Sequence, residues 1–287
     1  MTDATGPRRD TRGIVDAAEL LTRVRFRRRS PAPPLRPYLE HYWLIDWDLS
    51  EPYASRVVPH PSVNIVCERG QDTGDFAVLS GIGTGLFTKT LTGTGRVCGV
   101  QFRPGGFRPF APAWPAAEWT GRTVPLAEAF PLDGTAAAGA VLSPAGDDAR
   151  VAALDTLLLA HGPAPDPAAD EAMALVDLVR ADRTMRRVSA LARAGGLSPR
   201  SLQRLFAAYV GVGPKWVILR YRIHEALEQA ESAAGSGSAP DSGPGPGPDW
   251  ARLAAELGYS DQAHLVRDFT ATVGVPPSTY AKTLSVA

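Results

Sequence analysis

Two short stretches of the chain carry side chains that can form hydrogen bonds with the edges of nucleic-acid bases. They are GLSPRSLQRLF, residues 196–206, and GYSDQAHLVRDF, residues 258–269. A guanidinium can bond two acceptors of guanine at once, and a carboxamide can pair in a similar way with adenine. The outward positions of the two stretches are Arg200, Gln203 and Arg204, then Gln262, Ala263, His264 and Arg267. The Arg and Gln residues among them suit base recognition in a groove of a duplex.

The first stretch has the pattern of a tight turn followed by a helix. Gly196 permits the turn, Ser198 is a suitable N-cap and Pro199 suits the first helical position. Apolar residues at i, i+3 and i+4 spacing then predict a buried helix face. They are Leu202, Leu205 and Phe206.

The second stretch repeats this order of residues. It has Gly258 at the turn, Ser260 as the expected cap, and Leu265 and Phe269 as buried anchors. The copies are offset by 62 residues up to the serines and by 63 beyond them, because the second copy carries one extra residue. The scaffold residues recur while the outward residues differ, which is typical of two helix–turn–helix units that read different bases. A pair of αα-hairpins with solvated polar faces is the alternative interpretation.

The local charge distribution favours the first interpretation. The whole chain has 30 Lys and Arg against 30 Asp and Glu, so its net charge indicates no partner. Between residues 180 and 222, however, there are ten Lys and Arg but a single acid, Asp182. A basic block on helices is expected of a surface that binds a polyanion, although a solvated helix surface can have the same composition.

The C-terminal part of the chain, residues 168–287, resembles the DNA-binding domain of the AraC/XylS family of transcriptional regulators. Two segments carry the resemblance: VSALARAGGLSPRSLQRLFAAYVGVGPKWVILRYRIHEALEQA and WARLAAELGYSDQAHLVRDFTATVGVPPSTYAK. The G-V-x-P sequence after each expected recognition helix and the R-I-H-E-A sequence between them are typical of that family. The resemblance implies that a long helix joins two helix–turn–helix units, so that both recognition helices reach successive major grooves on one face of the DNA.

The resemblance also implies roles for single residues. It implies base contacts from the outward residues named above and phosphate contacts from four basic residues, Arg186, Arg187, Lys215 and Arg220. The chain departs from the family in two respects. A Ser-, Gly- and Pro-rich segment at 232–249 predicts a flexible insertion before the second unit. Ala263 and Val266 make the second reading surface less polar, so we expect the first unit to supply more of the affinity.

Residues 30–133 have the composition of short β-strands. Segments such as SVNIVCER, FAVLSGIG, LFTKTLTG and GRVCGVQFRP are separated by Gly and Pro, which is typical of a barrel or sandwich. This region resembles the cupin-like sensory domain attached to a subset of AraC/XylS regulators, which binds a small effector or mediates dimerisation. The predicted fold class is therefore α+β, with an N-terminal cupin-like β-barrel followed by an all-α domain with two helix–turn–helix units.

The expected domain organisation has four parts. Residues 1–29 are polar and arginine-rich and should form a flexible N-terminus before the β-rich domain at 30–133. Residues 134–167 should form a helical connection, and residues 168–287 the DNA-binding domain. A leucine stripe near 150–161 is a candidate dimer contact, with packing on the barrel of its own chain as the alternative.

Candidate residues for an effector pocket are Trp43, His60 and Arg103, because ligand pockets combine aromatic walls with a few polar groups. The alternative is that the aromatic side chains belong to the core. The sequence GIGTG at 81–85 is not followed by a helix, so we expect a hairpin turn and not a phosphate loop. His41 and His60 have no metal-ligand spacing, and we expect neither a metal nor a cofactor.

The sequence does not predict an enzyme. It has no G-x-S-x-G or CxxC pattern, and Cys67 and Cys98 lack flanking ligands. A DNA-tethered enzyme and an interaction scaffold with a degenerate DNA-binding half are the alternative hypotheses.

Two cysteines fit a reducing cytoplasm, and we find neither a signal peptide nor an apolar run of about 20 residues. We therefore expect a cytoplasmic protein with double-stranded DNA as its partner and no membrane contact. RNA polymerase, a small-molecule effector and a second copy of the chain are further candidate partners.

Overall fold

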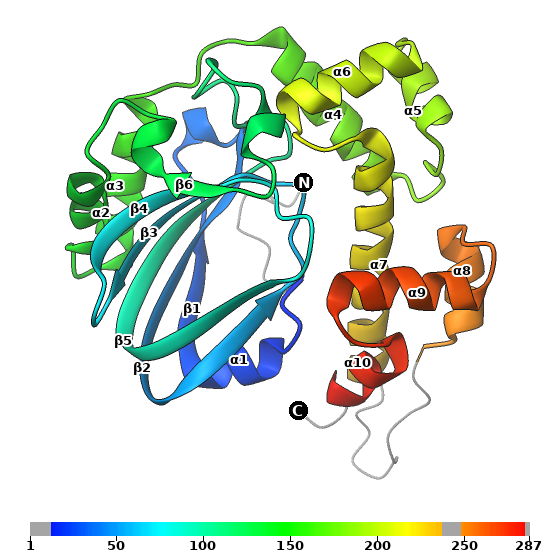
Figure 1. Ribbon diagram of the computed structural model, residues 1–287, viewed down its shortest axis with the longest axis horizontal. Coiled ribbons are helices and arrows are strands. Elements are labelled where there is room, and N and C mark those ends of the chain that lie inside the picture. Colours follow the sequence, from blue (N-terminus) through cyan, green and yellow to red (C-terminus); the bar gives the residue numbers. More distant parts are fainter. Residues whose placement is uncertain (1–12, 237–247, 285–287) are drawn as a thin grey trace, which may run out of the picture.

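The computed structural model describes residues 13–236 and 248–284. A curved β-sheet lies on one side of the molecule and a group of helices on the other (Figure 1). The sheet with helices α1 to α3, residues 13–159, is called the sheet half below. Helices α4 to α10, residues 167–236 and 248–284, are called the helical half. This order of a β-rich part and an all-α part confirms the predicted fold class.

The sheet has six described strands, each antiparallel to its neighbours, in the order β1-β2-β5-β3-β4-β6. The strands are β1 (Val24–Arg29), β2 (Leu39–Val57), β3 (Asn64–Gly70), β4 (Gly74–Ser80), β5 (Phe87–Phe102) and β6 (Thr123–Pro125). The two longest, β2 and β5, pair with each other, and their register shifts between Leu49 and Tyr53. A bulge of this kind bends a strand and increases its twist, which lets the long pair curve as the wall of a barrel does.

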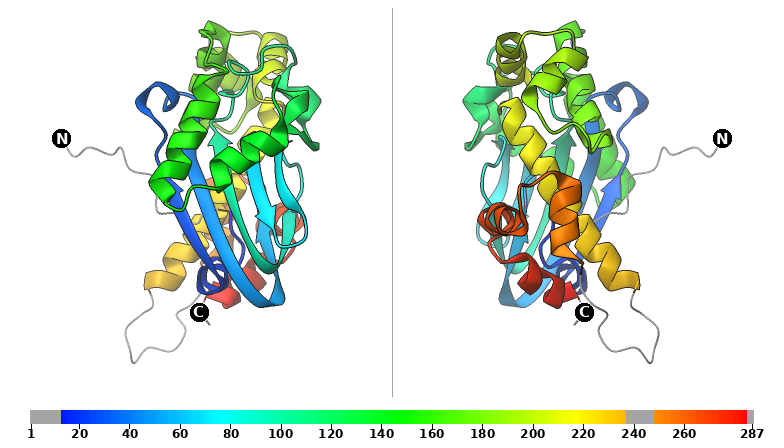
Figure 2. Two further views of the ribbon diagram at one scale, coloured as in Figure 1. Left: turned by 90° about the vertical axis from the view of Figure 1, so that its left-hand side faces the viewer. Right: turned by 90° about the vertical axis from the view of Figure 1, so that its right-hand side faces the viewer.

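Side chains alternate between the two faces of the sheet, and each face is covered by helix. One face carries Leu44, Cys98 and Val100 under α2 (Gly134–Leu142) and α3 (Asp147–Leu159), as the left view of Figure 2 shows. The other face carries Trp47 and Val97 under α1 (Ala17–Arg23). Three short 3-10 helices lie in the connections: η1 (Pro33–Leu35), η2 (Ala116–Trp119) and η3 (Leu126–Glu128).

The sheet begins at Val24, before the boundary expected at residue 30. Strand β1 carries three arginines on alternate positions, Arg25, Arg27 and Arg29, and all three form ion pairs with Asp147 at the start of α3. The other face of the strand packs Val24 and Phe26 against the core beside α1, so β1 is held both by charge and by apolar contacts. The sequence analysis missed this strand because only two apolar residues, Val24 and Phe26, alternate with its arginines, and so short a pattern is weak evidence for a strand.

The leucine stripe of α3 packs on the sheet of its own chain. Leu154 and Leu158 are fully buried in the main core, while Leu159 is exposed. The helix therefore packs on the core of its own chain, as the second of the two interpretations expects.

The GIGTG segment is not a hairpin turn. It connects β4 to β5, and β3 lies between those two strands in the sheet. The segment therefore crosses the end of β3, and its Thr84 carbonyl reaches the helical half. The expectation of a hairpin was wrong because short-range turn composition does not determine which strands pair.

The helical half consists of α4 to α10. The helices are α4 (Pro167–Ala181), α5 (Val188–Ala194), α6 (Pro199–Tyr209), α7 (Pro214–Ser236), α8 (Trp250–Leu257), α9 (Gln262–Val273) and α10 (Pro277–Leu284). Helix α7 is the long axis of this half in Figure 1, with α4 to α6 at one end and α8 to α10 toward the other.

The segment predicted as an insertion, 232–249, is shorter in the structure at both ends. Residues 232–236 continue α7, and Asp249 caps α8 by accepting hydrogen bonds from the N–H groups of Ala251 and Arg252. The central part of the predicted insertion, residues 237–247, lies outside the described residues.

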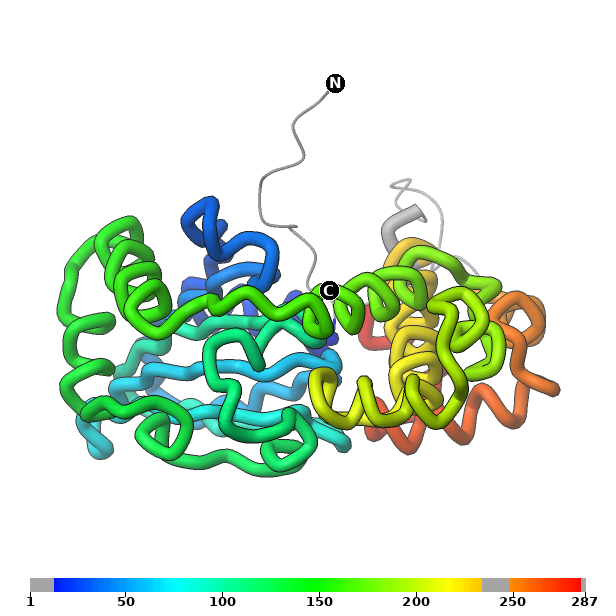
Figure 3. The backbone as a smooth tube through the Cα atoms, turned by 90° about the horizontal axis from the view of Figure 1, so that it is seen from above, coloured from blue at the N-terminus to red at the C-terminus, as the bar shows by residue number. Residues whose placement is uncertain are grey.

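The two halves share hydrophobic cores. The largest core joins Phe102 and Phe107 of the sheet half to Val176, Phe206 and Val217 of the helical half. A second core packs α7 to α10 together with two residues of the sheet half, Val15 and Val58. Seen from above, the halves lie side by side (Figure 3). The sheet half therefore contacts both ends of the helical half.

Candidate nucleic-acid interface

Helix α6 begins as the sequence predicts. Ser198 is its N-cap, and the Ser198 hydroxyl accepts a 3.1 Å hydrogen bond from the main-chain N–H of Ser201. Leu202 and Phe206 are fully buried and hold one face of the helix in the core. The opposite face carries the three predicted base-contacting residues, which are all exposed: Arg200, Gln203 and Arg204.

Helix α9 begins differently from the prediction, because its N-cap is Asp261 and not Ser260. The Asp261 carboxylate accepts a 2.7 Å hydrogen bond from the main-chain N–H of His264, and this bond lowers the pKa of Asp261. A carboxylate at this position also interacts favourably with the positive end of the helix. The one-residue shift corresponds to the extra residue of the second copy.

The outward positions of α9 are less uniform than those of α6. Three of them are exposed: Gln262, Ala263 and Arg267. His264 is half-buried, because its ring packs edge-on against Tyr259 at 5.1 Å and its Nδ1 lies 3.1 Å from the Ser260 hydroxyl oxygen. The second unit therefore exposes fewer groups that can donate or accept hydrogen bonds than the first.

Helices α6 and α9 lie on the same side of α7, one above the other (Figure 1 and the right view of Figure 2). Helix α7 has 23 residues, which at 1.5 Å per residue gives a length of about 34 Å. Successive major grooves on one face of B-DNA are also about 34–36 Å apart. The length of α7 is close to this spacing, and the second unit packs near the middle of the helix, on Ile223, Ala226, Leu227 and Ala230.

Three of the four residues predicted to contact phosphate are exposed: Arg186, Arg187 and Lys215. Arg187 directly precedes α5, and Lys215 lies in the first turn of α7, so both flank the first helix–turn–helix unit. The side chain of Arg186 instead reaches the second unit, where it donates a hydrogen bond to the main-chain carbonyl of Glu256.

Arg220, the fourth residue predicted to contact phosphate, is buried. Its exposure is only 5%, its Nη2 donates a 3.0 Å hydrogen bond to the Thr84 carbonyl, and its guanidinium lies 4.4 Å from the ring centre of Trp216. Its Nη1 is buried without a hydrogen-bond partner among the described residues. Burial lowers the pKa of Arg220 to about 10. The sequence missed this because the docking of the two halves is not visible in a local pattern.

The three predicted effector-pocket residues lie in three separate places. The indole of Trp43 covers Gly99, where an added Cβ would lie 1.9 Å from Trp43 Cε2. His60 stacks on His224 of α7 at 4.0 Å between ring centres. Arg103 forms an ion pair with Asp177 of α4. The structure therefore does not bring these residues into one pocket, and two of them connect the halves instead.

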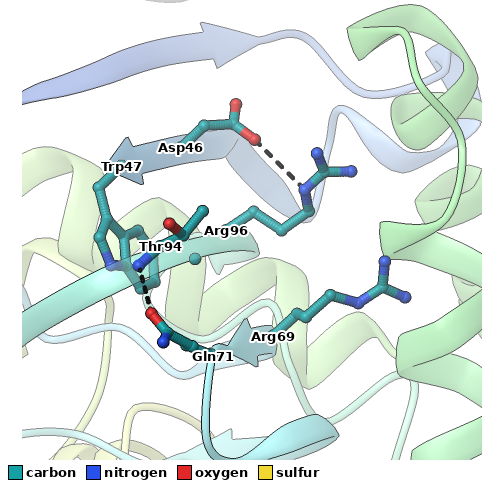
Figure 4. A pocket seen from close by; sticks show the side chains of 8 residues that line it. Asp46, Trp47, Arg69, Gln71, Thr94 and Arg96 are labelled. Atoms are coloured by element: carbon teal, nitrogen blue, oxygen red, sulfur yellow. Dashed lines mark hydrogen bonds and ion pairs between the residues drawn. The ribbon is translucent and has the colours of Figure 1, made fainter. Parts of the chain in front are cut away.

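A different depression opens beside the end of β3 and the middle of β2 and β5 (Figure 4). Its volume is about 650 Å³, and it is lined by Asp46, Trp47, Arg69, Gly70, Gln71, Thr94, Gly95 and Arg96. Its two arginines already have acidic partners, since Arg69 pairs with Asp75 and Arg96 with Asp46. No motif in the sequence indicated this depression.

The two cysteines are buried in facing positions of β3 and β5. Burial raises the pKa of Cys67 to about 12 and the pKa of Cys98 to about 11. Both thiols are therefore protonated at neutral pH and are poor nucleophiles.

Metal binding and membrane crossing are two further possibilities for the described part of the chain. No group of three or more His, Cys, Asp or Glu side chains there is arranged to hold a metal ion. Over residues 13–236 and 248–284, no helix combines the length and the apolar character needed to cross a bilayer.

Residues 27–125 match the family described as Domain of unknown function (DUF6597). None of the curated proteins compared with the chain matches it.

Solved structures of two proteins are similar to the chain. A transcriptional regulator with an AraC-type DNA-binding domain from Chromobacterium violaceum is 19% identical, with 40% of this chain and 92% of that chain covered and a TM-score of 0.32. ToxT from Vibrio cholerae is 12% identical. The similarity covers 85% of this chain and 98% of ToxT, with a TM-score of 0.43. A second ToxT structure, with bound unsaturated fatty acid, is 14% identical. The similarity covers 86% of this chain and 96% of that chain, with a TM-score of 0.40.

Proposed function

We propose that the protein is a sequence-specific DNA-binding transcriptional regulator whose two helix–turn–helix units read adjacent major grooves. In this proposal residues 168–287 form the DNA-binding domain, with α6 and α9 as recognition helices. One observation carries the proposal: two capped helices with exposed Arg and Gln side chains lie on the same side of a connecting helix about 34 Å long.

The chemistry of the exposed faces supports unequal roles for the two units. On α6, Arg200, Gln203 and Arg204 can each contribute about 1–3 kcal/mol of discrimination through base contacts. On α9, Ala263 offers only an apolar contact and His264 is held within its own unit. The first unit therefore supplies more of the affinity, and the second extends the recognised sequence.

Charged contacts between the halves support a regulatory role for the sheet half. Arg103 pairs with Asp177, and Arg180 pairs with Glu40, so two ion pairs join the sheet half to α4. A small effector or a second copy of the chain that changed the sheet half would act on α4 through these contacts and the shared cores.

Fluorescence anisotropy tests the proposal with duplexes tiled across the DNA upstream of the gene and with scrambled duplexes of the same composition. One upstream duplex is expected to bind more tightly than its scrambled partner. Its log affinity should fall with log salt by about 0.9 for each phosphate neutralised. Equal binding of every upstream duplex and its scrambled partner at all salt concentrations would overturn the proposal.

A further inference from the structure

Arg186 connects the segment just before the first helix–turn–helix unit to the second unit. Arg186 lies in the connection between α4 and α5, far from α8 in the sequence. Its guanidinium donates a hydrogen bond to the main-chain carbonyl of Glu256, near the C-terminal end of α8. The last carbonyls of a helix carry partial negative charge, so a cation there is a favourable partner.

The turn between α8 and α9 is built to receive this arginine. Gly258 has φ of +74°, and a Cβ at this position would lie 2.5 Å from Cδ of Arg186. Gly196, the matching glycine of the first copy, also has a positive φ, +64°, but an added Cβ there would meet no atom within 4 Å. Only the second copy therefore needs its glycine both for the turn and for the passage of a side chain.

The main chain of Arg186 is held by the connecting helix. Arg222 of α7 donates a 3.0 Å hydrogen bond to the Arg186 carbonyl, and its guanidinium lies 5.7 Å from the ring centre of Tyr259. One turn further along α7, Glu225 forms a 2.6 Å ion pair with Arg183. The segment around Arg186 is thus fixed to α7 and, through its side chain, to α8.

The contacts of α7 with α8 and α9 are mainly apolar, and Tyr280 of α10 donates a 2.9 Å hydrogen bond to the Glu231 carboxylate of α7. Leu253 and Leu257 of α8 pack with Ile223 and Leu227 of α7 in one core. Apolar burial has no preferred direction, whereas a hydrogen bond requires a defined donor–acceptor geometry. The core holds the second unit on α7, while directional contacts fix its rotation: Tyr280 ties α10 to α7, and Arg186 ties α8 to the segment before α5.

We propose that Arg186 is a positioning residue that sets the spacing and phase between the two recognition helices. This inference rests on the proposed DNA-binding function. It predicts that Arg186 controls how strictly the protein requires a given distance between two half-sites, beyond any contribution of its charge to phosphate binding.

The test uses the full-length protein and the upstream DNA segment that it protects in a footprint. That segment is resynthesised with one base pair inserted or removed between the two protected half-sites. The wild-type protein should bind the natural spacing most tightly. In Arg186→Ala, the ratio of the affinity for natural spacing to the affinity for altered spacing should fall about fivefold. This fall corresponds to about 1 kcal/mol less discrimination between the two spacings.

Two controls separate positioning from charge and from folding. Arg187→Ala removes the same charge from an exposed neighbour, and it should weaken binding to all spacings equally. Gly258→Ala should lower the spacing ratio as Arg186→Ala does, whereas Gly196→Ala, with a similar positive φ, should leave the ratio unchanged.

Three results would overturn the inference: an unchanged spacing ratio in Arg186→Ala, the same loss of ratio in Arg187→Ala, or a wild-type protein indifferent to spacing. A wild-type protein that gives no footprint would instead contradict the proposed function, so the two failures are distinguishable.

Discussion

The guanidinium of Arg220 on α7 donates a hydrogen bond of 3.0 Å to the main-chain carbonyl of Thr84, in the loop between β4 and β5. A cation of the helical half is thereby buried against the sheet half. Its Nη1 has no hydrogen-bond partner among the described residues, and no carboxylate forms an ion pair with it in that part of the chain. Burying a charge with so few partners is unfavourable.

Replacing Arg220 with methionine should therefore increase stability. Methionine can fill similar space without a charge to desolvate, and we expect the free energy of unfolding to rise by about 1 kcal/mol. Urea unfolding followed by circular dichroism measures this change. A loss of stability would show that the contacts of Arg220 with Thr84 and Trp216 outweigh the desolvation of its charge.

Arg204→Ala should weaken specific DNA binding by about 1–3 kcal/mol and relax the preference at one base position. The Arg204 side chain is exposed, so stability should change by less than about 0.5 kcal/mol. Binding to a set of single-base variants of the protected duplex measures both effects. Arg193 is an exposed arginine of α5, and Arg193→Ala is the control for loss of charge. If Arg193→Ala lost base preference as strongly as Arg204→Ala, α6 would not be the reading helix.

Lys215→Ala should weaken binding to specific and scrambled DNA by similar factors and reduce the salt slope by about 1. Lys215 is exposed at the start of α7, where it can approach a phosphate beside the groove occupied by α6. Affinity titrations over a range of salt concentrations give the slope. Lys282→Ala removes an exposed lysine from α10, outside the predicted contacts, and should leave the slope unchanged.

Asp147 should make the attachment of β1 sensitive to acid. The Arg27 guanidinium beside it lowers the pKa of Asp147, with smaller contributions from Arg25 and Arg29. A lowered folded-state pKa means that the stabilisation is fully present above the unfolded value of about 3.9 and is lost as pH falls through the folded value.

Asp147→Asn should therefore destabilise the protein by about 2–3 kcal/mol at pH 7, because several arginines lose their shared partner. The difference from the wild type should shrink below about pH 4. Urea unfolding of both proteins between pH 3 and pH 7 provides the comparison. A difference that stayed constant over this range would show that charge on Asp147 does not hold β1.

The parts that the sequence predicted are those set by local spacing. The apolar i, i+3, i+4 pattern of Leu202, Leu205 and Phe206 determined which face of α6 would be exposed, and Ser198 was correctly identified as its cap. In α9 the same reasoning selected Ser260 where Asp261 caps the helix, because two adjacent residues can both cap and only the geometry decides between them.

The parts that the sequence did not predict depend on contacts between distant segments. Arg103 and His60 were candidates for one pocket, yet each contacts a different helix of the helical half. Strand β1 is fixed by an aspartate more than a hundred residues away, which no local pattern reports. Residue type alone predicts that such side chains are polar or aromatic, but their partners follow from how the two halves dock.

The central claim, that α6 and α9 read two adjacent major grooves, is tested most directly by hydroxyl-radical footprinting on the DNA upstream of the gene. The account predicts protection in two segments on one face of the duplex, with centres about 10–10.5 base pairs apart. Arg204→Ala should reduce the protection of one segment, and Arg267→Ala should reduce the protection of the other. A single protected segment that responds to both substitutions, or no protection beyond that of scrambled DNA, would contradict it.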